Sequence, residues 1–333
     1  MKQVSPKQLL PELIEAINLK IPVMIWGKPG VAKSDLATLA CRMTNNADLD
    51  IRVNLLEPVD FRGIPHVVDG MTKWAMPDFL PNEALHGARG VMKLEELPTG
   101  LPGTQTCCYQ LVQDRKLGDY VMPEDWTIIG MGNSLSDRAA TFDMPSPLKN
   151  RFAHFELVAT IDDWADWAGK NNIDQSIISF LRFRPELLST FEPDNTAFAT
   201  PRSWANLSKR LEGSLLPDTM LTMMGGYVGE QAAGEYLAFR RIQADLPDID
   251  QAIANPDRCD VPDDISILYA FTGALVSRAH PKSIDNVMKL INRFPKEYQV
   301  FFLRDAINRN VEIAATQAVI TWMQDGDNTE LLT

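Results

Sequence analysis

A short segment near the start of the chain combines glycine, proline, lysine and serine in an order suited to holding phosphate. It reads Gly27-Lys28-Pro29-Gly30-Val31-Ala32-Lys33-Ser34 and lies between the apolar run Val23–Trp26 and the helical pattern Asp35–Met43. Backbone N–H groups of such a loop, with the positive end of the following helix, bind phosphate oxygens. Lys33 would reach the β and γ phosphates, and the Ser34 hydroxyl would bind Mg²⁺. The pattern therefore predicts a site for ATP and Mg²⁺.

One position of this segment departs from the usual pattern. Ala32 stands where glycine is expected, which matters only if that position requires a positive φ. The simpler alternative for the whole segment is a Gly/Pro turn that happens to precede a surface lysine.

Two carboxylates end another apolar run. Glu95 and Glu96 follow Gly90–Leu94 directly, and acidic groups at the carboxyl edge of a parallel sheet lie beside a phosphate loop. Glu95 would hold the Mg²⁺ shell through water, although aspartate is usual at this position. Glu96 would polarise the attacking water as general base. Without the upstream loop, such a pair would more often mark the exposed start of a helix.

Two further polar residues flank later apolar runs. Asn133 follows Trp126–Gly130, where its amide would orient the attacking water or contact the γ phosphate; alone it would be an ordinary turn asparagine. Arg151 precedes the last run and would project toward the nucleotide of a neighbouring subunit, where it would stabilise charge on the transferring phosphoryl group. The alternative for Arg151 is an ordinary surface arginine.

An arginine in the second half of the chain occupies an unusual position. Thr200, Pro201 and Arg202 are typical of an N-cap, a proline at the first helical position and a cation in the first turn. A cation is unfavourable at that end of a helix. Arg202 is therefore better explained by an anion opposite it, which is either a phosphate or a carboxylate of the same domain.

A sheet is needed to bring these residues together. Short apolar runs alternate with helical patterns in the first half of the chain, which predicts a parallel sheet covered by helices. A helix is expected first, at Pro6–Leu19. The expected strands are Pro22–Trp26, Ile51–Leu55, Val91–Leu94, Thr127–Gly130 and Phe155–Val158.

After Val158 the periodicity is helical. Asp162 and Asp163 are the expected N-caps of the first helix in this part. We therefore expect an α/β domain over residues 1–159 and an all-helical part over residues 160–333. Further helices are expected at Gln175–Leu188, Pro201–Leu211, Glu230–Ile242 and Ile265–Ser277.

Composition narrows the classes of function. The net charge of -12 over 333 residues makes binding to nucleic acid unlikely from the sequence, because a negative surface disfavours phosphate backbones. Neither a signal peptide nor a run long enough to cross a membrane is found, so a cytoplasmic protein without membrane contact is expected. No zinc site or disulfide framework is predicted from the four cysteines and four histidines, which are Cys41, Cys107, Cys108, Cys259, His66, His86, His154 and His280.

The order of these motifs along the chain resembles that of the AAA+ superfamily. The amino-acid sequence of three further segments resembles its MoxR-type ATPases. The segments that carry this resemblance are LEPVDFRGIP at 56–65, WAMPDFLP at 74–81 and YQLVQDRKLGDY at 109–120. The match runs from about Ile21 to Phe155 and extends with less detail through Arg202.

The resemblance implies an α/β fold, the AAA+ P-loop NTPase with a parallel sheet of order 5-1-4-3-2, followed by a helical lid and C-terminal helices. It implies ATP hydrolysis in a homo-hexamer and inserts at a loop around Gly63–Gly70 and a hairpin around Lys116–Met122. A chaperone role is also implied, in which a protein client is remodelled or activated beside a von Willebrand factor A domain partner. The implied site residues are Lys33 and Ser34 (Walker A), Glu95 and Glu96 (Walker B), Asn133 (sensor 1), Arg151 (arginine finger) and Arg202 (sensor 2).

Two other functions remain open. A nucleotide-gated scaffold would assemble with ATP and turn it over barely, and Ala32 and Glu95 are the residues that point to it. A ring motor subunit acting on nucleic acid would need a basic channel and a steeply salt-dependent affinity. Its local support is Arg115 and Lys116 in the expected hairpin.

Overall fold

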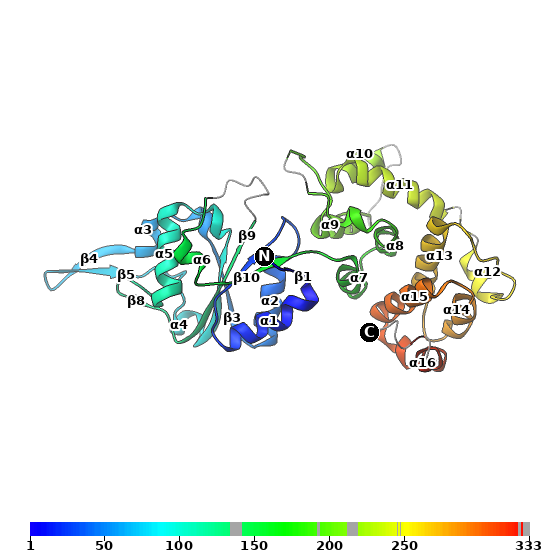
Figure 1. Cartoon of the computed structure of the whole chain (residues 1–333), viewed down its shortest axis with the longest axis horizontal. Helices are drawn as coiled ribbons and strands as arrows, with labels where there is room; N and C mark the ends of the chain where they lie inside the picture. Colours follow the sequence, from blue (N-terminus) through cyan, green and yellow to red (C-terminus); the bar gives the residue numbers. More distant parts are fainter. Residues whose placement is uncertain are drawn as a thin grey trace. The chain divides into compact units, whose positions relative to one another are not determined.

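The structure, a computed structural model, describes residues 1–133, 142–191, 194–211, 219–244, 246, 248–325 and 328. The chain divides into two compact units, Met1–Val158 and Ala159–Thr333. In the described residues the first unit combines strands and helices, whereas the second is built from helices (Figure 1).

A six-stranded parallel sheet forms the centre of the first unit. Its order is β1-β10-β2-β9-β6-β3, and all neighbouring strands are parallel. The five longer strands, numbered along the chain, give 5-1-4-3-2, which confirms the predicted fold; β1 is an additional edge strand that was not predicted. The strands are β1 (Gln3–Val4), β2 (Val23–Trp26), β3 (Ala47–Arg52), β6 (Arg89–Glu95), β9 (Asp125–Gly132) and β10 (Ala153–Leu157).

Helices cover both faces of this sheet (Figure 1). On one face lie α1 (Pro6–Asn18) and α2 (Lys33–Met43), and on the other lie α5 (Pro102–Asp114) and α6 (Ser146–Lys149). Met24 and Met92 point from the strands to the second pair of helices, where they share one buried cluster with Leu111 and Leu148. Shorter elements connect the strands: η1 (Val53–Leu55), α3 (Pro58–Arg62), α4 (Glu83–His86) and η2 (Leu97–Thr99).

The second predicted strand was misplaced. Ile51–Leu55 was expected, but β3 spans Ala47–Arg52 and Val53–Leu55 form the 3-10 turn η1. Asp48 and Asp50 alternate with apolar residues in β3, and a search for a continuous apolar run does not find such a half-buried edge strand.

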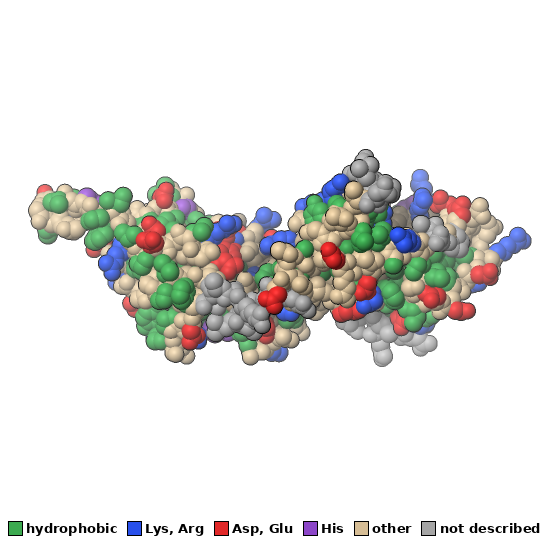
Figure 2. Space-filling view, turned by 90° about the horizontal axis from the view of Figure 1, so that it is seen from above, with side chains coloured by type: hydrophobic (Ala, Val, Ile, Leu, Met, Phe, Trp, Pro, Cys, Tyr) green, Lys and Arg blue, Asp and Glu red, His purple; other side chains and the backbone are tan. Residues whose placement is uncertain are grey.

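Two antiparallel hairpins extend from the first unit. One consists of β7 (Lys116–Leu117) and β8 (Tyr120–Val121), as expected. The other consists of β4 (Ile64–Val68) and β5 (Met71–Ala75), so the expectation of a loop around Gly63–Gly70 was wrong. Asp69 and Gly70 both have a positive φ, which suits the two-residue turn of a hairpin. Hydrophobic side chains are exposed along β4–β5 (Figure 2), among them Ile64, Val67 and Met71.

The described part of the second unit contains two hydrophobic clusters. One includes Phe180, Trp204 and Tyr236 and gathers the earlier helices; the other includes Phe271 and Phe302 and gathers the later ones. The helices and 3-10 turns are α7 (Ile161–Lys170), α8 (Gln175–Phe183), η4 (Pro185–Leu188), α9 (Pro201–Leu211), α10 (Met220–Val228), α11 (Glu230–Ala244), α12 (Ile249–Ala254), α13 (Ile265–Arg278), α14 (Ile284–Ile291), α15 (Lys296–Arg309), η6 (Val311–Ala315) and α16 (Gln317–Gln324).

Two details of this unit differ from the prediction. The expected helix Gln175–Leu188 is broken at Pro185 into α8 and η4, because proline disfavours helical geometry in the residue before it. The N-cap of α7 is Thr160, whose hydroxyl accepts from the N–H of Asp163 at 3.3 Å. Asp162 and Asp163 lie in the first turn instead, where carboxylates favour the positive end of the helix.

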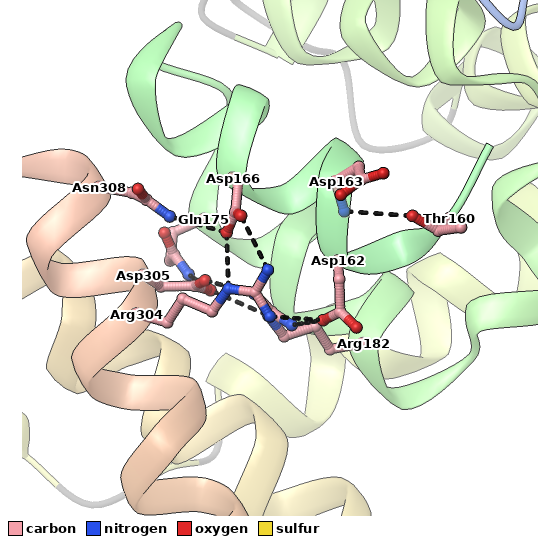
Figure 3. A network of polar contacts seen from close by, with 9 residues as sticks. All are labelled: Thr160, Asp162, Asp163, Asp166, Gln175, Arg182, Arg304, Asp305 and Asn308. Carbon is pink, nitrogen blue, oxygen red and sulfur yellow. Dashed lines mark hydrogen bonds and ion pairs between the residues drawn. The ribbon is translucent and has the colours of Figure 1, made fainter. Parts of the chain in front are cut away.

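A polar network joins α15 to α7 and α8 (Figure 3). Asp305 is almost fully buried, and one of its oxygens lies 2.6 Å from Nη2 of Arg182. Arg304 donates to both oxygens of Asp166 at 2.8 Å. Arg182 and Arg304 also both bind Asp162, at 3.2 and 3.1 Å. The network therefore ties the later helices to the first two helices of the unit.

Candidate functional site

The predicted phosphate loop lies between the end of β2 and the start of α2. A Cβ atom on Gly27 would lie 2.7 Å from the carbonyl oxygen of Leu157, so β10 leaves no room for a side chain there. Gly30 has a φ of 76° and Ala32 a φ of 70°. These two left-handed residues turn the chain so that α2 begins at Lys33.

Ala32 occupies a conformation that favours glycine. It is the N-cap of α2, with φ 70° and ψ 33°, and its side chain makes no capping hydrogen bond. The left-handed region costs a residue with a Cβ atom about 1–2 kcal/mol. The position does require a positive φ, so the departure from glycine has a structural cost.

Lys33 of the phosphate loop contacts Asn133, another predicted site residue. Its Nζ atom donates to the carbonyl oxygens of Gly27 at 2.7 Å and Lys28 at 3.2 Å, and to Oδ1 of Asn133 at 2.9 Å. Asn133 follows β9 directly, beside the end of β2, because Trp26 pairs with Gly132 in the sheet. The loop lysine and the predicted sensor asparagine are therefore in direct contact.

The two carboxylates lie at the same edge of the sheet. Glu95 is the last residue of β6, and Glu96 caps η2 with a φ of 56°. The carbonyl oxygen of Glu96 accepts from the backbone N–H of Thr99 at 3.0 Å and from its hydroxyl at 2.8 Å. A positive φ is uncommon for a residue with a Cβ atom, and here it turns the chain from the end of β6 into η2.

The packing of α2 on β6 relates Ser34 to Glu95. Lys93 of β6 donates to the Thr38 hydroxyl of α2 at 2.7 Å. Glu95 lies two residues further on the same face of the strand, about 6.7 Å along it. Ser34 lies four residues earlier on the same face of the helix, about 6 Å along it. Since α2 runs opposite to the parallel strands, Ser34 and Glu95 reach the same level at the sheet edge.

Sequence reasoning missed Lys93, which holds three elements together. Its side chain is 1% exposed, and its Nζ atom lies 2.6 Å from Asp48 and 2.7 Å from Asp50 on β3, in addition to its hydrogen bond to Thr38. Burial lowers the pKa of Lys93, but the hydrogen bonds to the two carboxylates outweigh it and raise the pKa above its usual value. Two features of the sequence could have indicated this ion-pair cluster: Lys93 stands inside an apolar run, and Asp48 and Asp50 alternate with apolar residues.

Arg151 lies on the surface of the first unit, between α6 and β10. Its Nε atom donates to the side-chain oxygen of Gln113 on α5. Its role as an arginine that acts on a neighbouring subunit stays a prediction.

Arg202 belongs to the second unit and lies in the first turn of α9. The capping prediction is confirmed: the Thr200 hydroxyl accepts from the N–H of Ser203 at 3.0 Å, and the Ser203 hydroxyl accepts from the N–H of Thr200 at 2.7 Å. Arg202 is exposed and has no ion-pair partner within the described part of the chain. No carboxylate among the described residues of its own domain therefore offsets its charge.

Of the two basic residues at the short hairpin, Arg115 is held by backbone carbonyls and Lys116 is exposed to solvent. Nη2 of Arg115 donates to the carbonyl oxygens of Pro123, Glu124 and Trp126 at 2.7, 3.2 and 2.7 Å. Arg115 therefore has a structural role in joining the hairpin to β9. Lys116 is left as the exposed cation of this pair.

The remaining cysteines and potential metal ligands give no second candidate site among the described residues. Cys107 and Cys108 are buried in α5, and burial raises the pKa of both thiols. Among the described residues, no group of three or more His, Cys, Asp and Glu side chains is placed to hold a metal ion. The described helices include none that is both long and apolar enough to span a bilayer.

Comparison with known proteins gives likenesses among solved structures. No protein-family model matches the chain, and no curated protein matches it. NtrX from Brucella abortus is 17% identical, with 73% of this chain and 61% of its own covered and a TM-score of 0.43. The chain thus spans about three fifths of the NtrX chain that it matches.

Two further solved structures have similar sequence identities and TM-scores. The RuvB Holliday junction branch migration motor of Thermotoga maritima is 15% identical, with coverage of 81% and 80% and a TM-score of 0.40. Hsp104 with ATPγS and casein is 15% identical, with coverage of 76% and 46% and a TM-score of 0.40. The strand order and the loop after β2 are themselves those of an AAA+ P-loop NTPase fold.

Proposed function

We propose that this chain, with its AAA+ P-loop fold, binds ATP·Mg²⁺ at the loop Gly27–Ser34 and hydrolyses the nucleotide. The observation that carries the proposal is the contact of Lys33 with Asn133, which are 100 residues apart in the sequence. It joins the loop to the edge where β6 and β9 end. Backbone donors, a lysine, two carboxylates and an amide at one sheet edge form a set suited to phosphoryl transfer.

The residues present fit a magnesium nucleotide. Mg²⁺ keeps several waters and takes one or two protein ligands besides phosphate oxygens, so it needs no cluster of three carboxylates. Ser34 and Glu95, at one level of the site, would hold the ion or its waters. The ion would neutralise charge on the phosphates and help to align them.

The remaining site residues have separate roles in the proposal. Glu96 accepts a proton from the attacking water, and Asn133 orients that water. Lys33 exchanges its bonds to the loop carbonyls for phosphate oxygens. Arg151 stabilises the transferring phosphoryl group of a neighbouring subunit. Arg202 provides a further cation for the phosphates, which is supported by its lack of an ion-pair partner in the described residues.

We further propose that copies of this chain form a homo-hexameric ring in the cytoplasm and act as a MoxR-like chaperone on a protein client, with a von Willebrand factor A domain protein as partner. The sequence resemblance supports this role. The β4–β5 hairpin supports it as well, because contiguous exposed apolar side chains favour contact with another protein. The engagement of Arg115 by backbone carbonyls removes half of the local support for a nucleic-acid motor.

A nucleotide-gated scaffold is the second candidate. The observation that favours it is the left-handed conformation of Ala32, because strain in the loop offsets part of the binding energy available from phosphate. Glu95 also favours it, because a side chain longer than the usual aspartate would hold an ion or its waters further from the sheet.

Phosphate release with ATP and Mg²⁺ tests the proposal, at a protein concentration high enough for assembly. The wild type is expected to turn over, whereas Lys33→Ala and Glu96→Gln lose most of the rate. Glu96→Gln should still bind ATP, which equilibrium binding of a fluorescent analogue measures. Binding without turnover in both the wild type and Glu96→Gln would reject the hydrolytic function of the isolated protein and favour the scaffold.

A further inference from the structure

We propose that His154 is a positioning residue that fixes the segment bearing Arg151 to the strand that leads into the phosphate loop. The inference rests on the proposed function, in which Arg151 acts on the nucleotide of a neighbouring subunit. It adds a route within one subunit from the phosphate loop to that arginine.

His154 contacts the residue that directly precedes the loop. It lies on β10 opposite Met24 of β2, and Trp26 is two residues further on the same face of that strand. Nε1 of Trp26 donates to Nδ1 of His154 at 2.9 Å. The two rings are stacked, with centroids 6.1 Å apart and planes 17° apart. Since Gly27 follows Trp26, a shift at the start of the loop reaches the imidazole through one residue.

The other ring nitrogen holds the end of α6. Nε2 of His154 lies 2.7 Å from the carbonyl oxygen of Lys149, the last residue of that helix. A carbonyl oxygen only accepts and an indole N–H only donates, so Nε2 carries the proton and Nδ1 accepts. The neutral imidazole with this one tautomer satisfies both partners. The Lys149 carbonyl also accepts from the backbone N–H of Phe152 at 3.3 Å, so the imidazole adds a second bond to a carbonyl that already closes the turn around Arg151.

Arg151 follows this anchored carbonyl by two residues and has little freedom to move independently. Phe152 is buried and meets the His154 ring edge-to-face at 6.3 Å, and the guanidinium of Arg151 is bonded to Gln113. The backbone around Arg151 is thus held by His154 on both sides. The position of the guanidinium depends on that of β2 through two hydrogen bonds and one stacked ring pair.

Assemblies mixed from two kinds of subunit separate the positioning of Arg151 by His154 from any effect of His154 on nucleotide bound to its own subunit. Subunits with Lys33→Ala have a defective loop but keep Arg151, whereas subunits with Arg151→Ala keep the loop. Phosphate release should recover when the two are mixed. His154→Phe is then added to the Lys33→Ala subunit, whose own site is already inactive. The recovered rate should fall at least about tenfold, because displacements of about 1 Å cost on the order of a hundredfold in rate.

Two further variants in the same subunit keep the test independent of folding defects. His154→Gln retains an acceptor for Trp26 and a donor for Lys149, so it should retain most of the recovered rate. Trp26→Phe removes the donor and keeps a ring, so it should lower the rate in the same direction as His154→Phe. Each variant must keep the melting temperature of its parent subunit.

The outcomes distinguish the inference from the proposed function. Unchanged recovery with His154→Phe in the Lys33→Ala subunit would overturn the positioning role of His154 and leave the ATPase proposal intact. If the parent mixture recovers no activity although the wild type turns over, the action of Arg151 across subunits is wrong and the inference falls with it. A wild type without turnover overturns the proposed function itself.

Discussion

Replacing Ala32 by glycine is expected to stabilise the first unit. The left-handed conformation at φ 70° costs alanine about 1–2 kcal/mol relative to glycine. Glycine gives back part of this gain because it raises the conformational entropy of the unfolded chain, by about 0.4–1 kcal/mol. The net gain in the free energy of unfolding is therefore about 1 kcal/mol.

This gain corresponds to a measurable shift in melting temperature. The first unit spans Met1–Val158, and an unfolding entropy of about 2.1 cal/mol/K per residue gives about 0.33 kcal/mol/K for it. A stabilisation of about 1 kcal/mol raises Tm by about 3 °C. Scanning calorimetry of the full chain without nucleotide measures this shift in the transition of the α/β unit.

A matched control lies in the same helix. Ala37 is fully buried in α2, where glycine is disfavoured by about 1 kcal/mol and the lost methyl group adds to the cost. Ala37→Gly should therefore lower Tm by at least about 3 °C. A decrease in Tm for Ala32→Gly as well would show that Ala32 is not strained and would refute the reasoning.

Three other predictions concern stability, metal binding and thiol reactivity. Asp305→Ala leaves the buried guanidinium of Arg182 without its main partner and should lower the free energy of unfolding of the helical unit by about 3–5 kcal/mol in calorimetry. Adding Arg182→Met to this variant should recover most of the lost free energy of unfolding. If it does not, the unpaired guanidinium of Arg182 is not the cause of the destabilisation. Lys93→Met removes the bond to Thr38 that sets α2 against β6, so the Mg²⁺ concentration for half-maximal phosphate release should rise severalfold; a change in Tm alone would contradict this. Burial raises the pKa of Cys41 to about 12, which leaves only about one thiolate in ten thousand at pH 8. Iodoacetamide should therefore modify the partly exposed Cys259 first in the native protein, and mass spectrometry showing earlier modification of Cys41 would contradict the burial argument.

The sequence predicted those features that depend on local order along the chain. The loop between an apolar run and a helix, four of the five longer strands of the parallel sheet and the capped start of α9 all follow from neighbouring residues. The resemblance then supplied the strand order, which no local pattern contains. Ala32 was recognisable as a departure, but its φ of 70° depends on how α2 packs against the sheet.

Contacts between distant segments could not be predicted in the same way. The sequence predicted no role for His154, because its partner Trp26 is 128 residues away and no spacing relates the two. Lys93 and Thr38 meet only once the register of α2 on β6 is known. β3 was displaced in the prediction because the aspartates that bind Lys93 interrupt its apolar pattern.

The edges of the main sheet restrict how copies of this chain can associate. One edge is β1, which has two residues, and the other is β3, which carries Asp48, Asp50 and Arg52 on the same face. Very short strands and charged edges oppose the addition of another strand, and they protect a sheet from edge-to-edge polymerisation. Strand addition between copies is therefore disfavoured at both edges of the main sheet. The growth of amyloid-like aggregates would begin instead at the β4–β5 hairpin, whose outer edges pair with no other strand in the described part of the chain.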